Sequence, residues 1–102
     1  MVRHWIRVQV KFGEWKAFCA ALKVHNDDAA RVGIPEYRVW SPQAGPFGEA
    51  FLEAEYASVD EIHARIGAAR KDEQYEAKLE ALFAHTVPGT QADWELDPED
   101  LG

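Results

Sequence analysis

Hydrophobic residues repeat along this chain with two different periods, and the order of these periods predicts the secondary structure. Apolar residues that recur every three or four positions are typical of amphipathic helices, and they cover residues 14–32 and 58–85. Apolar residues at every second position indicate half-buried strands. This second period covers four segments, 2–12, 36–41, 47–56 and 90–96. The predicted order is therefore βαββαβ.

Local signals mark where the two helices begin and end. Gly33 suits the residue that follows a helix, and Pro35 prevents the first helix from continuing. Residues 58–61, Ser-Val-Asp-Glu, form a capping box in which the Ser58 hydroxyl accepts from the Glu61 amide and Glu61 reaches back. The apolar pattern is interrupted near residue 70, and Asp72 can cap a new helical segment. We therefore expect the second helix to be kinked or broken there.

The βαββαβ order predicts a ferredoxin-like α+β sandwich, with a four-stranded antiparallel sheet and helices on one face. The expected strand order is 4-1-3-2. Residues 1–97 form one domain, and residues 98–102 form an acidic tail. The alternation in the first strand predicts which side chains face the helices. These are His4, Ile6, Val8, Val10 and Phe12.

Composition and charge restrict the kind of protein further. The chain has 102 residues, of which 47% are hydrophobic and 28% charged, as expected for one globular domain. The net charge of −7 argues against nucleic acid or an anionic membrane as the main partner. Cys19 is the single cysteine, and no apolar run has the length of a signal peptide or a membrane span. We therefore expect a cytoplasmic protein.

The sheet face without helices carries large aromatic residues among charges. Such a patch is rarely left bare on a monomer, and aromatic residues and arginine are enriched in interfaces. We therefore predict a homodimer formed by packing sheet against sheet, with cross-strand ion pairs between bases and acids. The alternative is a solvated face with ordinary salt bridges. The predicted interface residues are Trp5, Arg7, Arg38, Trp40, Phe51 and Glu53.

Two stretches, Gly48–Glu61 and Asp72–Tyr75, resemble a known family. They are similar to the strand, the "Y-x-S-hydrophobic-acid-E" helix start and the later "D-x-x-aromatic" of small NIPSNAP-like and antibiotic-biosynthesis-monooxygenase-like proteins. The resemblance implies the dimeric α/β barrel, a superfamily that includes cofactor-independent monooxygenases, cyclases and isomerases. It also implies a ligand pocket inside each protomer, between the sheet and its helices.

His4 would face this implied pocket, and it is the candidate catalytic residue. A neutral imidazole on the inner side of the first strand can act as a general base. The alternative is a hydrogen-bonded histidine at a strand end. Related cyclases carry a His-Pro-x-His segment in the second helix, whereas residues 68–72 contain no histidine. The predicted pocket-lining residues are Ile6, Val8, Trp15, Leu52, Tyr56, His63 and Tyr75.

The remaining chemistry-bearing residues add no second site. The three tyrosines are expected to be core aromatics whose hydroxyls reach the surface, with a pocket hydroxyl as the alternative. No two histidines have close metal-ligand spacing, so we predict no metal site and no cofactor. Three functions stay open. The protein is an enzyme acting on a small aromatic or apolar molecule, a non-catalytic module binding a small ligand or a partner, or a structural domain without a ligand.

Overall fold

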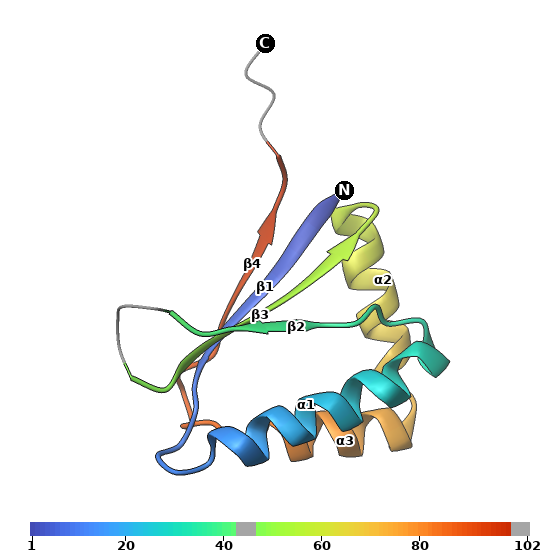
Figure 1. Cartoon of the computed structure of the whole chain (residues 1–102). Helices are drawn as coiled ribbons and strands as arrows, with labels where there is room; N and C mark the ends of the chain where they lie inside the picture. Colours follow the sequence, from blue (N-terminus) through green and yellow to red (C-terminus); the bar gives the residue numbers. More distant parts are fainter. Residues whose placement is uncertain (43–46, 99–102) are drawn as a thin grey trace.

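The computed structural model describes residues 1–42 and 47–98, and it confirms the predicted fold class. A four-stranded sheet is covered on one face by helices (Figure 1). The strands are β1 (Val2–Gln9), β2 (Arg38–Trp40), β3 (Glu49–Tyr56) and β4 (Ala92–Leu96). The helices are α1 (Trp15–Ala29), α2 (Val59–Ala69) and α3 (Glu73–Phe83), with a short 3-10 turn, η1 (Ala30–Val32), after α1.

The strand order is β2-β3-β1-β4, and each neighbouring pair is antiparallel, as predicted. In this register Ile6 on β1 lies opposite Leu52 on β3, and both are buried under the helices. Trp5 lies between Glu53 on β3 and Trp94 on β4, on the other face. The two faces of the sheet are therefore distinct, one forming the core and the other left without helices.

The core lies between the sheet and the helices, and α1 and α3 run side by side beneath it (Figure 1). Its large, fully buried side chains come from every helix and from both central strands. They are Phe18, Leu52, Ile62, Leu82 and Val8. His4 is buried on the same side as Ile6 and Val8, so the predicted alternation holds over the first part of β1.

The alternation does not extend to Phe12, and the prediction that this residue faces the helices is wrong. The pairing of β1 with β3 runs to Gln9 opposite Glu49, and a last hydrogen bond from the amide of Val10 to the carbonyl of Gly48 at 2.9 Å closes the ladder before Phe12. Gly13 then adopts a left-handed conformation with φ 80°, which only glycine adopts without strain. The phenyl ring of Phe12 is consequently 90% exposed. β2, β3 and β4 are also shorter than predicted.

The second helical region is broken, as predicted, into α2 and α3. The carboxylate of Asp72 accepts the amide of Tyr75 at 3.0 Å and so caps α3. The Ser58 hydroxyl accepts the amide of Glu61 at 3.1 Å at the start of α2. The reciprocal half of the predicted capping box differs, because the Glu61 carboxylate pairs with Arg65 one turn later.

Two predictions concern segments that the structure describes only in part. The predicted hairpin loop between β2 and β3 includes residues 43–46, which lie outside the described residues. The predicted acidic tail lies outside them too, apart from Pro98. Within residues 1–42 and 47–98, no helix combines the length and the apolar character that crossing a membrane requires.

Candidate functional site

A cavity of about 440 Å³ lies between the sheet and the helices. Its walls are mostly aliphatic and come from β1, β3 and all three helices. These apolar wall residues are Ile6, Leu22, Leu52, Ile62, Ile66, Leu79, Leu82 and Phe83. Nine residues with polar groups line the same space. They are His4, His25, Tyr37, His63, Arg70, Tyr75, Gln91, Asp93 and Glu95. Apolar walls with a few placed polar groups are typical of small-molecule sites.

His4 stands at the centre of one polar chain in this cavity. Its Nδ1 lies 2.6 Å from the Tyr37 hydroxyl, and its Nε2 lies 3.4 Å from a carboxylate oxygen of Asp93. The Tyr37 hydroxyl continues the chain to the Tyr56 hydroxyl at 2.8 Å. The chain therefore runs from a carboxylate on β4 to an imidazole on β1, then to a phenol in the segment before β2. That phenol also bonds to a second phenol, Tyr56 on β3.

The ionisation of this chain follows from its contacts. The hydrogen bond to His4 lowers the pKa of Asp93, which keeps its carboxylate charged. Burial raises the pKa of Tyr37 and of Tyr56, so both phenols stay protonated at neutral pH. A carboxylate on one side of an imidazole and a phenol on the other orient the ring and would stabilise a proton placed on it.

A second polar chain lies beside the first. The Nε2 atom of His25 on α1 is 3.0 Å from the Tyr75 hydroxyl on α3, and its Nδ1 is 3.2 Å from Oδ1 of Asn26. The ring of Tyr37 packs edge-on against His25 at 6.2 Å and against His4 at 5.8 Å between ring centroids. The two histidines thus flank one tyrosine.

The three tyrosine hydroxyls do not reach the surface, which corrects the expectation from the sequence. Tyr37, Tyr56 and Tyr75 are all buried, and their hydroxyls bind His4, one another and His25. A buried phenol needs a partner for its O–H, and the histidines supply it inside the molecule. Tyr37 and Tyr75 both line the cavity, and their positions therefore favour the alternative, in which the tyrosines are pocket hydroxyls.

A buried titratable histidine makes stability depend on pH. Burial lowers the pKa of His25 below the ordinary value of 6.5. The unfolded chain then binds a proton between these two pKa values while the folded chain does not, so the free energy of unfolding should fall as the pH drops below 6.5. Urea denaturation at pH 7 and pH 5 measures this. A His25→Gln variant should lose less stability over that interval than the parent, and an equal loss would contradict this role.

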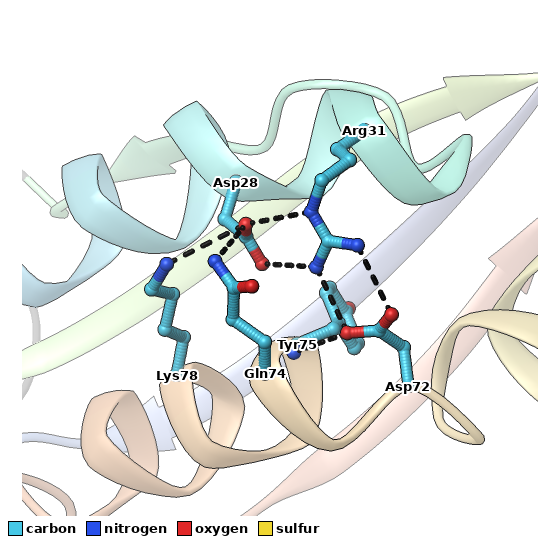
Figure 2. Close-up of polar contacts among 6 residues, drawn as sticks. All are labelled: Asp28, Arg31, Asp72, Gln74, Tyr75 and Lys78. Atoms are coloured by element: carbon cyan, nitrogen blue, oxygen red, sulfur yellow. Dashed lines mark hydrogen bonds and ion pairs between the residues drawn. The ribbon is translucent and has the colours of Figure 1, made fainter.

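An ion-pair network outside the cavity holds α3 against α1 and η1 (Figure 2). The guanidinium of Arg31 binds both carboxylate oxygens of Asp72 at 2.8 and 3.0 Å, and it binds Asp28 at 3.1 and 3.2 Å. Gln74 and Lys78 approach the same oxygen of Asp28. Because Asp72 also caps the turn that contains Tyr75, this network positions the second polar chain.

The network makes a further pH prediction. The hydrogen bonds from Arg31 lower the pKa of Asp72 and of Asp28, so their contribution to stability is present above the ordinary value of 3.8 and is lost as the pH falls below it. An Arg31→Gln variant should be less stable than the parent at pH 7, and the difference should shrink towards pH 2.5. A Lys71→Gln control, which removes the same charge nearby, should show no such convergence. A gap that stays constant with pH would contradict this account.

The predicted pocket residues divide into two groups. His4, Ile6, Leu52, His63 and Tyr75 line the cavity, whereas Val8, Trp15 and Tyr56 do not. Val8 is buried further along β1, and Tyr56 meets the cavity residues through the hydroxyl of Tyr37 and edge-on against the ring of His4, at 6.4 Å between ring centroids.

Two of these residues have surroundings that their sequence positions did not show. Trp15 lines a separate surface hollow beside Phe12 and Phe47. His63 stands at the rim of the cavity, where its side chain is 67% exposed and its Nε2 lies 2.8 Å from Glu95.

Three residues of the polar chains, His25, Asp93 and Tyr37, were not among the predicted pocket-lining residues, although two of them left a signal in the sequence. His25 lies on the same helical stripe as Phe18, Leu22 and Ala29, and a polar residue on an apolar stripe marks a polar group in the core. Asp93 precedes Trp94 in β4 and so points to the opposite face, which is the helix side. Tyr37 lies before a short strand, and no local pattern ties it to His4.

The helix-free face gathers the six predicted interface residues, as the register requires. Trp40, Phe51 and Arg7 lie in one row, and Arg38, Glu53 and Trp5 lie in the next. The exposed aromatic surface is larger than predicted, because Trp94 from β4 joins it. Trp94 is 40% exposed and Trp40 is 51% exposed.

The charges on this face are paired across strands. The indole N–H of Trp5 donates to Glu53 at 2.7 Å, and Arg3 lies 3.6 Å from Glu53 and 3.7 Å from Glu55. The guanidinium carbon of Arg7 lies 5.6 Å from the ring centre of Trp94. The predicted cross-strand ion pairs are confirmed. The face is therefore aromatic, and two of its acids, Glu53 and Glu55, are paired with Arg3.

No metal site emerges from the part of the chain that the structure describes, where no three histidine, cysteine, aspartate or glutamate side chains could hold an ion together. Cys19 is only partly buried, and burial raises the pKa of its thiol, which disfavours the reactive thiolate.

Comparison with solved structures places this geometry in a known fold. A NIPSNAP family protein from Agrobacterium tumefaciens matches with a TM-score of 0.77 and 16% identity, over 99% of this chain and 88% of that one. A NIPSNAP domain protein from Burkholderia xenovorans matches with a TM-score of 0.78 and 13% identity, over 100% and 98%. An antibiotic biosynthesis monooxygenase matches with a TM-score of 0.71 and 12% identity, over 98% and 100%.

These matches establish the fold, which is that of the superfamily the sequence resembles. No family model matches the sequence, and no curated protein does so either. What the cavity does must therefore be argued from its own residues.

Proposed function

We propose that this protein is a cytoplasmic homodimer whose cavities bind a small aromatic or apolar molecule, and that His4 removes a proton from it without a cofactor. The observation that carries the proposal is a buried imidazole lining an apolar cavity, with the Asp93 carboxylate on one side and the Tyr37 phenol on the other. This is the arrangement of a general base with a group that stabilises its protonated form.

Of the two ring nitrogens of His4, Nε2 has the weaker partner, and it is the one that we assign to the ligand. Its contact with Asp93 is long, at 3.4 Å, whereas Nδ1 and the Tyr37 hydroxyl are only 2.6 Å apart. For Nε2 to accept a proton, Nδ1 must carry the hydrogen and donate to Tyr37, which in turn donates to Tyr56. The imidazolium formed would pair with Asp93. The resulting phenolate or carbanion could then take the proton back at another carbon, which is an isomerisation, or attack a carbonyl carbon of the same molecule and close a ring. With dioxygen as co-substrate and oxidant, a ring CH₂ group would become C=O, and the second oxygen atom would leave as water with the two hydrogens.

One observation favours a second function, which is a non-catalytic module that binds a small ligand. Both ring nitrogens of His4 already have partners, and a neighbouring carboxylate favours the tautomer with hydrogen on Nε2. In that tautomer His4 offers no lone pair to a ligand. The two functions thus differ in which nitrogen of the His4 ring carries the hydrogen before a ligand binds.

The dimer is supported by the helix-free face. Trp5, Trp40, Phe51 and Trp94 form an aromatic surface on one side of the sheet, a feature that monomers seldom leave in water. Packing of two such faces by a two-fold axis would bury them against each other. Cytoplasmic location is supported by a single cysteine that forms no disulfide.

Native mass spectrometry of the freshly purified protein, followed by denaturing analysis, is the first test. We expect a dimer that carries a small aromatic or apolar molecule. A His4→Gln variant should keep the ligand and lose turnover by about a hundredfold or more, because glutamine hydrogen-bonds but cannot act as a base. Turnover equal to that of the parent would refute the catalytic role of His4. A bound ligand with no turnover in the parent would favour the non-catalytic module.

A further inference from the structure

The side-chain amide of Asn26 has a fixed orientation. The backbone N–H of Tyr37 donates to Oδ1 of Asn26 at 3.1 Å, and Nδ2 of Asn26 donates to the carbonyl oxygen of Tyr37 at 2.8 Å. A backbone N–H can only donate and a carbonyl can only accept, so the reverse orientation of the amide would lose both hydrogen bonds.

This orientation determines the tautomer of His25. Nδ1 of His25 lies 3.2 Å from Oδ1 of Asn26, an oxygen that can only accept, so Nδ1 must carry the hydrogen. Burial lowers the pKa of His25, so the ring is neutral at pH 7 and Nε2 has a free lone pair.

The tautomer in turn determines the direction of the next hydrogen bond. Nε2 of His25 lies 3.0 Å from the Tyr75 hydroxyl, and without a hydrogen it must accept from that hydroxyl. Burial raises the pKa of Tyr75 to about 12, so the phenol keeps its proton. Its single hydrogen is used on His25. The oxygen of Tyr75 can therefore only accept, and it has no further hydrogen bond within residues 1–42 and 47–98.

We propose that Asn26, His25 and Tyr75 make the cavity selective for ligands that carry an O–H or N–H donor. Tyr75 and Asp93 line the same cavity from α3 and β4, and the carboxylate of Asp93 also only accepts. The Tyr37 hydroxyl already bonds to His4 and Tyr56, and its single hydrogen lies on one of these two contacts, so it does not donate into the cavity. Phenols and aromatic amines fit these acceptors, whereas ethers leave them unpaired. Carboxylates add like charge to Asp93 and Glu95, and the one arginine of the lining, Arg70, is already bound by both carboxylate oxygens of Glu76. This selectivity rests on the ligand-binding role proposed for the cavity.

The tautomer can be measured without a ligand and without a variant. Long-range ¹H–¹⁵N spectra of the ¹⁵N-labelled protein at pH 7 distinguish a protonated ring nitrogen from an unprotonated one. We expect hydrogen on Nδ1 of His25 and none on Nε2. Hydrogen on Nε2 would overturn the inference, because His25 would then donate to Tyr75 and leave the Tyr75 hydroxyl free to donate into the cavity.

The selectivity is tested with a matched pair of probes, 2-naphthol and 2-methoxynaphthalene, titrated by calorimetry. We expect the parent to bind 2-naphthol about tenfold more tightly than the ether, the effect of one hydrogen bond to a buried acceptor. A Tyr75→Phe variant should lose most of this preference and still bind the ether as the parent does. Equal binding of both probes by the parent would overturn the selectivity.

The outcomes separate this inference from the proposed function. If neither probe binds, the ligand role of the cavity is refuted and the selectivity with it, while the tautomer of His25 still decides the direction of the Tyr75 hydrogen bond. If 2-naphthol binds with the expected preference and His4→Gln turns over normally, the selectivity holds and the catalytic role of His4 fails.

Discussion

A Phe51→Asp variant is expected to be a monomer at concentrations where the parent is a dimer. Phe51 lies in the middle of the helix-free face, opposite Arg7 on one side and Trp40 on the other, and its ring packs against Trp5 at 6.1 Å. A two-fold interface would contain the new carboxylate twice, and each one would lose its hydration inside an aromatic surface. The cation opposite it, Arg7, already lies over the ring of Trp94 and would have to leave that ring to pair with it. The dissociation constant should rise by about a thousandfold or more.

Analytical ultracentrifugation over a range of concentrations measures this effect. Phe12→Asp is the matched control, because Phe12 is an equally large aromatic that lies beyond the end of β1 and is almost fully exposed. The control should associate like the parent. A Phe51→Asp variant that remains dimeric, or a parent that sediments as a monomer, would show that the helix-free face is not a dimer interface.

A Leu52→Ala variant should lose about 2–5 kcal/mol of unfolding free energy. The Leu52 side chain is 1% exposed, lies between Ile6 and Val39 in the sheet, and forms part of the cavity wall. Its removal forfeits burial and opens more empty space, because the strands on both sides cannot close the gap. Domains of this size have about 5–15 kcal/mol of stability in total, so the loss is severe.

Urea denaturation at one fixed protein concentration checks this prediction, since association would otherwise add to the measured stability. Leu52→Met is the control that keeps the volume of the side chain, and it should cost less than about 1.5 kcal/mol. A loss below about 1 kcal/mol for Leu52→Ala would mean that the wall collapses into the cavity.

The fold could be predicted because each of its elements leaves a local pattern. The alternation in residues 2–10 and the alternation that ends at Tyr56 follow from strands with one buried face. Asp72 indicated the break between α2 and α3, because an aspartate that follows an interruption of the apolar pattern can cap a new helix. Phe12 was misplaced since alternation cannot show where a partner strand stops pairing.

The site was predicted only in part, because its chemistry depends on contacts between distant segments. His4 could be assigned to the helix side by alternation alone. Its partners Tyr37 and Asp93 are 33 and 89 positions away, and only the packing of the sheet brings them together. The pairing of His25 with Tyr75 likewise spans two helices.

The Asn26 amide has a consequence for the edge of the sheet. β2 is an edge strand of three residues, and an unpaired edge invites strands from other molecules to add to it. Asn26 occupies both the N–H and the C=O of Tyr37, the residue just before β2. The amide thus takes the place of a neighbouring strand at this position and leaves nothing there for an incoming chain to bind. The residue that orients His25 therefore also blocks strand addition at Tyr37, where the edge of the sheet begins.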